Sequence, residues 1–257
     1  MSPVPPPGTA TSPASPDWTL VIPAYNEEAR LGNSLRTILQ FVVQRAPQTF
    51  EVIVVDDGST DATAALVERE FPQVRLLRNP GNRGKGYSVR AGLLEARGRW
   101  VLFSDADLST PIEELIPCEE HLKQGYDVVI TSRALPDSII EIHQAWWRER
   151  SGRLFNQLVR LISGLPYPDT QCGFKAYTRP AARRIARLQR LDGFAFDVEQ
   201  LRLAQMLKLR VAEIPVHWIN SFATRVNFLS DAPRMLRDVL RVRCMRYDLT
   251  GRQEDNA

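Results

Sequence analysis

Cysteine and histidine are scarce in this sequence, with three of each among 257 residues. The cysteines stand far apart and fit neither a disulfide framework nor a zinc-binding pattern, which favours a reducing, cytoplasmic setting. The histidines match no metal-ligand spacing, so we expect all three to be structural. These residues are Cys118, Cys172, Cys244, His121, His143 and His217.

Long apolar runs are also absent. No stretch approaches the roughly 18 apolar residues of a membrane span, and the N-terminus has no apolar core of a secretory signal. Residues 1–17 are rich in proline, serine and threonine, a composition that cannot offset the entropy of ordering. We therefore expect a disordered arm over 1–17, one domain over 18–249 and a frayed tail over 250–257. The protein is expected to be soluble or peripheral to a membrane.

Charge is distributed unevenly along the chain. Residues 1–120 carry 11 lysines and arginines against 16 acidic residues, a net of −5, whereas residues 121–257 carry 22 against 14, a net of +8. Most of the cations are arginine, whose planar guanidinium suits phosphate groups. The asymmetry suggests a metal in the first half and an anionic partner for the second. Solvated helix faces would explain the charges equally well.

Hydrophobic periodicity predicts alternating strands and helices in the first half. Strands are expected at 18–23, 50–55, 74–77, 100–104 and 126–131, and helices at 27–45, 60–71, 84–96 and 112–124. Ser59 or Thr60 is the expected N-cap of the second helix, with Asp61 in its first turn. The pattern indicates an α/β fold with a mostly parallel sheet, helices on both faces and ligands beyond the carboxyl ends of the strands.

The second half is less regular. Strands are expected at 173–177 and 211–218, and helices at 145–162, from Pro180 onward, at 197–209 and at 232–247. Neither an internal repeat nor a second domain boundary is visible.

Two carboxylates, Asp105 and Asp107, follow the strand predicted at 100–104. At positions i and i+2 of an extended chain they project to one side, and two like charges that close normally need a cation. Mg²⁺ or Mn²⁺ suits such a site because it takes one or two carboxylates and completes its shell with phosphate and water.

Two further polar segments follow strands or open helices. D-D-G-S-T-D (56–61) closes the second strand and contains good turn and capping residues, while one of its first two aspartates can face a ligand. N-R-G-K-G (82–86) opens a helix with small residues and two cations. Backbone N–H groups at such a position suit an anion, although the spacing matches neither the P-loop nor the dinucleotide fingerprint.

With these segments in place, the chain resembles family 2 glycosyltransferases of the GT-A (nucleotide-diphospho-sugar transferase) fold over about residues 18–135. The segments that carry the resemblance are V-I-P-A-Y-N-E-E (21–28), V-V-D-D-G-S-T-D (54–61), N-R-G-K-G (82–86) and S-D-A-D-L (104–108). The second half resembles polyprenyl-phosphate glycosyltransferases, with the dolichyl-phosphate β-glucosyltransferase branch nearest and the mannosyltransferase branch as its sister. Its matching segments are T-S-R (131–133), D-T-Q-C-G-F-K (169–175), F-A-F-D-V-E (194–199) and E-I-P-V-H-W (213–218).

The resemblance implies a role for each matching residue. Residues 18–135 would bind a nucleotide-sugar donor and residues 136–249 the acceptor. Asp105 and Asp107 would hold Mg²⁺ or Mn²⁺ on the donor diphosphate. The expected nucleotide-sugar-binding residues are Pro23, Tyr25, Glu27 (on the ribose), Asp56 or Asp57 (facing the base), Lys85, Ala106 and Arg225. Arg133 would face the acceptor phosphate. Apart from the resemblance, Arg148 and Arg150 are expected at the same phosphate, because they begin the helix predicted after the next loop and can close over the cleft.

Two departures from the family pattern bear on the donor. Ser109-Thr110-Pro111 follows D-A-D-L, where the mannosyl branch typically has Gln-His-Pro, and this favours the glucosyl branch and UDP-glucose. Phe222-Ala223-Thr224-Arg225 stands where the family usually has Gly-Ser-Lys or a similar segment. Arg225 is therefore the expected cation for the donor diphosphate.

The implied reaction is a single displacement with inversion at the anomeric carbon. A lipid-phosphate acceptor is already an anion and needs no strong general base, whereas a sugar hydroxyl would need one, with Glu141, Asp169 and Asp197 as candidates. We expect hexose transfer to a dolichyl or undecaprenyl phosphate. The alternatives are a GDP-mannose-dependent enzyme and a family 2 enzyme acting on a soluble glycan, small molecule or protein. A nucleic-acid-binding module is least favoured because no such motif is present.

Membrane contact would come from surface helices. Trp146 and Trp147 precede Arg148 and Arg150, which pairs interfacial aromatics with cations. Residues 232–247 mix arginines with apolar residues, and a core-packed helix with a solvated arginine face would give the same pattern. The expected location is the cytoplasm, at the inner face of the membrane.

Overall fold

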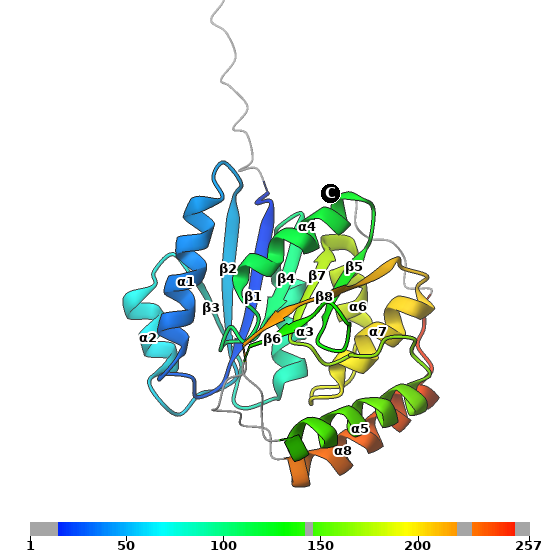
Figure 1. The fold of residues 1–257 in the computed structure, drawn as a ribbon. Coiled ribbons are helices and arrows are strands. Elements are labelled where there is room, and N and C mark those ends of the chain that lie inside the picture. Colours follow the sequence, from blue (N-terminus) through cyan, green and yellow to red (C-terminus); the bar gives the residue numbers. More distant parts are fainter. Residues whose placement is uncertain (1–14, 142–145, 220–227, 250–257) are drawn as a thin grey trace, which may run out of the picture.

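The computed structural model describes residues 15–141, 146–219 and 228–249, with the side chains of 146–149, 153 and 228–231 left outside the description. At its centre is a seven-stranded sheet in the order β3-β2-β1-β4-β7-β5-β8 (Figure 1). The strands are β1 (Trp18–Ala24), β2 (Phe50–Asp56), β3 (Arg75–Arg78), β4 (Trp100–Ser104), β5 (Val128–Ser132), β7 (Phe174–Thr178) and β8 (Val211–Pro215). Only β7 runs antiparallel to its neighbours in this sheet, so the predicted mostly parallel sheet is confirmed.

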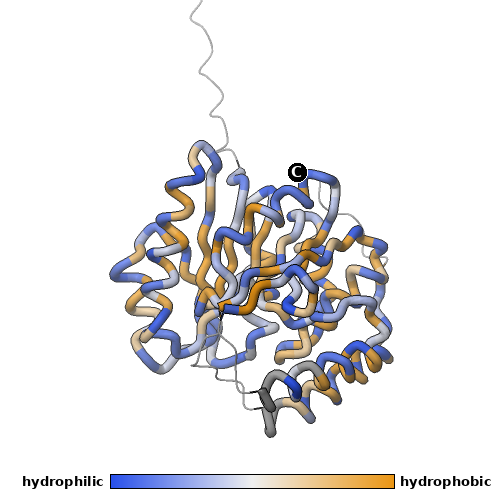
Figure 2. The backbone as a smooth tube through the Cα atoms, viewed as in Figure 1, coloured by the Kyte–Doolittle hydropathy of each residue, from blue (hydrophilic) through white to orange (hydrophobic). Residues whose placement is uncertain are grey.

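Helices cover both faces of the sheet. One face carries α1 (Leu31–Gln44), α2 (Thr63–Glu70) and α4 (Leu115–Lys123), and the other carries α3 (Lys85–Glu95), α6 (Arg179–Leu188) and α7 (Phe196–Met206). Alternate strand residues point to opposite faces: Leu20 and Ile22 pack with the first set of helices and Val21 with the second. The central strands therefore contribute apolar residues to the cores on both faces, and Figure 2 shows hydrophobic residues along these strands.

The two long helices of the second half lie side by side. α5 (Trp146–Ser163) packs along α8 (Phe228–Cys244), and the pair lies at the lower right of Figure 1. Phe155 and Val159 of α5, with Val239 and Val242 of α8, belong to the core on the α3 side of the sheet. Within the described ranges, no helix is long and apolar enough to cross a bilayer.

A second, two-stranded sheet was not predicted. The sequence predicts one strand over 211–218, but β8 ends at Pro215, and β9 (His217–Trp218) pairs in parallel with β6 (Ile139–Ile140) instead. Pro215 has no N–H to continue the ladder. The polypeptide leaves the main sheet there, and the Val216 N–H donates to the Ser138 hydroxyl at 3.2 Å.

The predicted helix cap at Ser59 or Thr60 is wrong. α2 begins at Thr63, and Asp61 precedes the helix. The Asn26 N–H donates to the Ser59 hydroxyl at 2.9 Å, and the Thr60 N–H donates to the Asn26 side-chain oxygen at 2.7 Å. These two residues therefore join the loop after β2 to the loop after β1 instead of starting a helix.

Other helix ends differ from the predictions by a few residues. The helix predicted over 27–45 is α1, Leu31–Gln44, because residues 28–30 form a turn in which the Leu31 N–H donates to the Glu27 carbonyl oxygen. The helix predicted over 112–124 opens with a 3₁₀ turn, η1 (Ile112–Glu114), before α4. The helix predicted over 232–247 is α8, which begins earlier and ends at Cys244.

Candidate active site

The loops that follow β1, β2 and β4 meet at the carboxyl edge of the sheet. Hydrogen bonds from Asn26 join the first two loops. An ion pair between Arg30 Nη1 and Asp107 Oδ2, at 3.4 Å, joins the first to the third. The three loops and the ends of the strands before them hold six of the eight predicted nucleotide-sugar-binding residues, all except Lys85 and Arg225, so the structure brings these six together.

Asp105 directly follows β4 and is fixed through its backbone. Its N–H donates to the Gly173 carbonyl oxygen, which precedes β7, at 3.0 Å. Its carboxylate forms an ion pair with Lys85, the first residue of α3, with 2.7 Å between Nζ and Oδ1. Strand β4 and helix α3 thus set the position of this carboxylate.

Asp107 lies two residues further on, in a strained loop. Its Oδ1 accepts a hydrogen bond from the Ser109 N–H at 3.1 Å. Between them, Leu108 has a φ of 48°, in the left-handed region, where a bulky residue costs about 1–2 kcal/mol. Strain of this kind persists at functional sites because the surroundings impose it, and here it shapes the loop that carries Asp107.

Lys85 remains charged in this setting. Burial lowers the pKa of its ammonium group, but the carboxylates of Asp105 and Asp197 outweigh burial, so the pKa is raised above its ordinary value. A positive charge therefore stands beside Asp105 at the start of α3, where backbone N–H groups also favour an anion.

Arg30 is a site residue that the sequence reasoning missed. Glu27 is buried, its N–H donates to the Thr63 hydroxyl at 2.7 Å, and its carboxylate pairs with the Arg30 guanidinium, with 2.7 Å between Oε1 and Nη2. Arg30 also reaches Asp107 and so links two predicted site residues. In the sequence, the one signal for this role of Arg30 was its position three residues after Glu27, a spacing at which the two side chains can pair.

Asp56 and Asp57 are both buried but have different neighbours. Asp57 uses both oxygens to hold the N-R-G-K-G segment: Oδ1 accepts from the Arg83 N–H at 3.0 Å, and Oδ2 from the Gly84 N–H at 2.8 Å. Gly84 has a φ of 101°, which favours glycine. Asp56 Oδ1 accepts from the Ser59 N–H at 3.1 Å. Asp57 therefore positions the loop that carries Lys85.

Arg133 directly follows β5 and pairs with Asp169. Its Nε lies 2.7 Å from Oδ2 and its Nη2 3.0 Å from Oδ1. Only 1% of the Asp169 side chain is exposed, so this pair is not a surface salt bridge. Burial lowers the pKa of Arg133, but Asp169 outweighs it and Asp105 adds to the rise. Arg133 follows β5 and Asp105 follows β4, and these two strands flank β7 and end at the same edge of the sheet.

The three candidate general bases already have partners. Asp169 pairs with Arg133, and Glu141 lies 2.6 Å from His217 Nε2. Asp197 pairs with Lys175 in the interior, where burial raises the pKa of Asp197 despite the opposing effect of the lysine. Two of the three are thus held in buried ion pairs.

The remaining predicted residues are placed as follows. Pro23 is buried within β1, Tyr25 follows the strand with 37% of its surface exposed, and Ala106 is buried between the two aspartates. Arg150 is exposed on α5. Arg148 belongs to the same helix, but its side chain lies outside the described part, and Arg225 lies outside the described residues altogether.

The residues at this edge fit a Mg²⁺ or Mn²⁺ ion that draws on outside ligands. Asp105 and Asp107 supply two hard oxygen donors after β4. Across the described ranges, no group of three or more His, Cys, Asp or Glu side chains could hold a metal by itself. Two carboxylates match a cation that takes its other ligands from phosphate and water.

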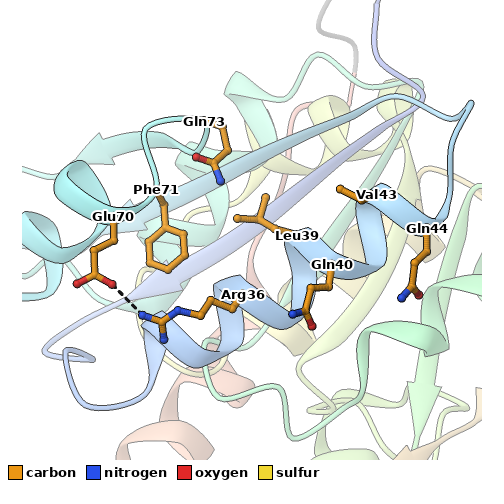
Figure 3. A pocket seen from close by; sticks show the side chains of 8 residues that line it. All are labelled: Arg36, Leu39, Gln40, Val43, Gln44, Glu70, Phe71 and Gln73. Carbon is orange, nitrogen blue, oxygen red and sulfur yellow. Dashed lines mark hydrogen bonds and ion pairs between the residues drawn. The ribbon is translucent and has the colours of Figure 1, made fainter.

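A hollow on the surface lies away from these residues. It lies between α1 and the segment that follows α2, and its lining includes Arg36, Val43, Glu70 and Phe71 (Figure 3). No predicted site residue lines it, and an ion pair of 2.8 Å between Arg36 and Glu70 spans its wall. It plays no part in the site.

Replacing Gly173 by alanine is expected to lower kcat/KM roughly a hundredfold while the protein stays folded. A Cβ at this position would stand within 2.7 Å of all three carboxyl atoms of Asp105, so that carboxylate would have to move, and a displacement of about 1 Å can cost about a hundredfold in rate. Steady-state kinetics and thermal unfolding measure the two effects.

Gly152→Ala is the matched control, because a Cβ there meets no atom within 4 Å. It should leave kcat/KM unchanged and stabilise α5 slightly, since alanine is the better helix former. Activity of Gly173→Ala within threefold of the unaltered protein would contradict the placement of Asp105.

The sequence pattern described as Glycosyl transferase family 2 matches residues 19–186. Two curated proteins of similar sequence are named dolichyl-phosphate beta-glucosyltransferase. The one from Trichomonas vaginalis is 38% identical over 222 residues, 82% of this chain and 66% of that protein. The human one is 33% identical over 248 residues, 91% of this chain and 76% of that protein. The chain thus spans about two thirds to three quarters of their length.

Among solved structures, the chain resembles glucosyl-3-phosphoglycerate synthase from Mycobacterium tuberculosis in complex with Mn²⁺, UDP and glucosyl-3-phosphoglycerate. The TM-score is 0.63 and the sequence identity 21%, over 89% of this chain and 79% of that one. At this identity the likeness shows the fold alone.

Proposed function

This chain belongs to glycosyl transferase family 2 and has the GT-A fold, and from that premise we propose that it transfers a hexose from a nucleotide-sugar to a polyprenyl phosphate. The proposed donor is UDP-glucose, and the proposed acceptor is dolichyl or undecaprenyl phosphate. The names of the relatives from Trichomonas vaginalis and human support this acceptor class.

The observation that carries the proposal is the neighbourhood of Asp105, Asp107 and Arg133 at one sheet edge. Asp105 and Asp107 follow β4 and Arg133 follows β5, and these strands flank β7 and end at the same edge of the sheet. Acids that can hold a cation suit the donor diphosphate. A fixed guanidinium suits an anionic acceptor.

On the donor side, we assign the nucleoside to the loops after β1 and β2. Pro23, Tyr25 and Glu27 would line its pocket, with Glu27 at the ribose. Of the two aspartates we assign Asp56 to the base, because both oxygens of Asp57 already accept backbone hydrogen bonds. Lys85, beside Asp105 at the start of α3, would meet the diphosphate together with Arg225.

The chemistry is a single displacement at the anomeric carbon. An oxygen of the acceptor phosphate forms the new bond to that carbon as the bond to the diphosphate oxygen breaks, with inversion. The acceptor oxygen is already an anion at neutral pH, so no proton has to be removed. Arg133 binds and orients this phosphate, with Arg148 and Arg150 assigned to the same task, and Lys85 stabilises the charge that develops on the leaving diphosphate.

Asp105 and Asp107 would hold Mg²⁺ or Mn²⁺. When bound, the ion would neutralise charge on the donor diphosphate as a Lewis acid. The two aspartates follow β4 closely, and within the described residues no third His, Cys, Asp or Glu side chain joins them, which supports a cation shared with the donor.

We also propose peripheral contact with the inner face of a membrane through α5 and α8. Leu154, Leu158 and Leu161 are exposed by 59%, 38% and 75%, and their spacing places them on one stripe of α5. Arg150 shares that stripe by register, and Leu240 of α8 is 53% exposed. An apolar stripe with arginines is typical of helices that lie in a bilayer interface.

Incubation of the purified protein with labelled sugar nucleotides tests the function. With Mn²⁺ or Mg²⁺ present, UDP-glucose and dolichyl phosphate should give a labelled, organic-extractable product, and GDP-mannose should give at least tenfold less. Dolichol without its phosphate should give none, because it lacks the anionic oxygen. UDP should bind more tightly than GDP, and only with the metal present.

Other outcomes would redirect the assignment. A clear preference for GDP and GDP-mannose would place the chain in the mannosyl branch. Absence of lipid product together with transfer to a glycan, small molecule or protein would show that the acceptor is soluble.

A further inference from the structure

We propose that Asp169 is a positioning residue for the acceptor: it holds the Arg133 guanidinium in the one orientation that presents its outer edge to a phosphate. The inference rests on the proposed function, because it takes Arg133 to be the group that meets the acceptor. It assigns to Asp169 a role other than the general base considered from the sequence.

The first observation is how completely Asp169 is fixed. It lies in the interior with 1% of its side chain exposed. Its Oδ1 also accepts from the Gln171 N–H at 3.1 Å, and Oδ2 also accepts from the Arg133 N–H at 3.1 Å. Burial raises the pKa of Asp169, but Arg133 more than compensates, so the pKa is lowered and the group stays ionised. A buried charge anchored in this way holds its partner firmly.

The second observation concerns which atoms of Arg133 are engaged. Asp169 occupies the side edge of the guanidinium, made of Nε and Nη2. The indole ring of Trp218 in β9 lies 4.8 Å from the guanidinium carbon and restrains it by cation–π contact. Nη1 and the second hydrogen of Nη2 form the other edge of the fork, and 31% of the Arg133 side chain is exposed. One edge is thus anchored, while the other can donate two hydrogen bonds to the oxygens of a phosphate.

The third observation explains why an anchor matters at this place. Asp105 and Arg133 follow β4 and β5, two strands that flank β7 and end at the same edge of the sheet. A long, unrestrained arginine beside that carboxylate would tend to pair with it. Asp169 already pairs with Nε and Nη2 of the guanidinium, and so it keeps the proposed acceptor-binding group from pairing with the carboxylate assigned to the donor.

Asp169→Asn tests the proposal, because asparagine keeps the shape and loses the charge. We expect the KM for dolichyl phosphate to rise about tenfold, with kcat changed less than threefold and the affinity for UDP unchanged. Arg133→Ala should raise the KM, or lower kcat, tenfold to a hundredfold, and Arg133→Lys should recover only part, because an ammonium group lacks the fork. Combining Asp169→Asn with Arg133→Ala should add nothing to Arg133→Ala alone.

Asp127→Asn is the matched control. Asp127 accepts a hydrogen bond from the Arg210 N–H at 2.8 Å, just before β5 begins, at the opposite end of that strand from Arg133. It should leave the KM unchanged whatever it does to stability. The positioning role is wrong if the effects of Asp169→Asn and Arg133→Ala on the KM multiply in the double variant. It is also wrong if Asp169→Asn weakens UDP binding instead. Should Asp169→Asn fail to fold, Trp218→Leu, which removes the ring, must raise the KM severalfold for the proposal to stand.

A spectroscopic readout separates this inference from the proposed function. In protein labelled with ¹⁵N-arginine, the Arg133 Nε–Hε signal should be sharp and slow to exchange, and Asp169→Asn should broaden it or abolish it. A signal that survives unchanged overturns the inference even if the protein uses dolichyl phosphate. If Asp169→Asn abolishes the signal but the unaltered protein does not use dolichyl phosphate, the inference that Asp169 restrains Arg133 stands and the proposed acceptor is wrong.

Discussion

Replacing Asp107 by alanine will lower kcat by at least about a thousandfold, equivalent to about 4 kcal/mol of transition-state stabilisation. The side chain stands in the pair of carboxylates assigned to the cation, and a metal-bound diphosphate contributes several kcal/mol to such a reaction. Thermal unfolding should change little, because the residue is partly exposed and its contacts are those to Ser109 and Arg30. Rates at saturating donor and Mn²⁺ titration by electron paramagnetic resonance measure the loss.

Asp137→Ala is the control for this variant. Asp137 is an exposed aspartate in the loop between β5 and β6, and its loss should leave at least half of the activity. Asp105→Ala should be about as damaging as Asp107→Ala. Activity of Asp107→Ala within tenfold of the unaltered protein, in buffer with excess metal, would show that the cation is not held here.

Lys175→Met is expected to lower the free energy of unfolding by about 3–5 kcal/mol, the usual cost of removing one partner from a buried ion pair. Only 1% of the Lys175 side chain and 6% of the Asp197 side chain are exposed. Lys175 Nζ also donates to the Cys172 carbonyl oxygen at 2.7 Å. Methionine fills similar space but leaves Asp197 without its closest cation. Urea unfolding followed by circular dichroism gives the value.

Lys123→Met removes a lysine whose side chain is 58% exposed and lies 2.5 Å from Glu119. Glu119 is buried but keeps Arg45 and Gln48 as partners, so the loss should cost less than about 1 kcal/mol. The double variant Lys175→Met, Asp197→Leu should recover part of the lost stability, because no lone charge remains buried. A loss below about 1 kcal/mol for Lys175→Met alone would mean that the pair contributes little to folding.

The parts of the fold that local patterns determine could be predicted. The continuous apolar runs at 18–23, 50–55 and 100–104 became the central parallel strands, because a strand covered on both faces has to be apolar on both. The GT-A fold and the family were likewise predicted from ordered motifs and are confirmed. The placement of Asp105 and Asp107 together follows from their sequence spacing alone.

Contacts that depend on β7 could not be predicted. Its antiparallel insertion beside β4 brings Gly173 against Asp105, and no local pattern announces which strand will be the neighbour. Asp197 was considered as a base, but its pairing with Lys175 depends on how α7 packs behind the sheet. The prediction of a helix cap at Ser59 or Thr60 was wrong for the same reason. Asn26, from another loop, donates to the Ser59 hydroxyl and accepts from the Thr60 N–H.

Several assigned roles stay predictions. Arg225 lies outside the described residues, as does the side chain of Arg148, so the role of each rests on its place in the sequence. The roles of Pro23, Tyr25 and Glu27 follow from their motif and their position after β1.

The place of β7 also dictates the order in which this protein can fold. β4 ends at residue 104, but its partner β7 starts at residue 174, so the middle of the sheet closes only after a long detour of the polypeptide. During synthesis, β4 presents an unpaired edge until then, and such an edge is open to incorrect pairing. A polypeptide cut after residue 135 would retain β5 but neither of its neighbours, β7 and β8. The loops to which we assign the donor therefore cannot be separated, as an independently folding piece, from the half to which we assign the acceptor.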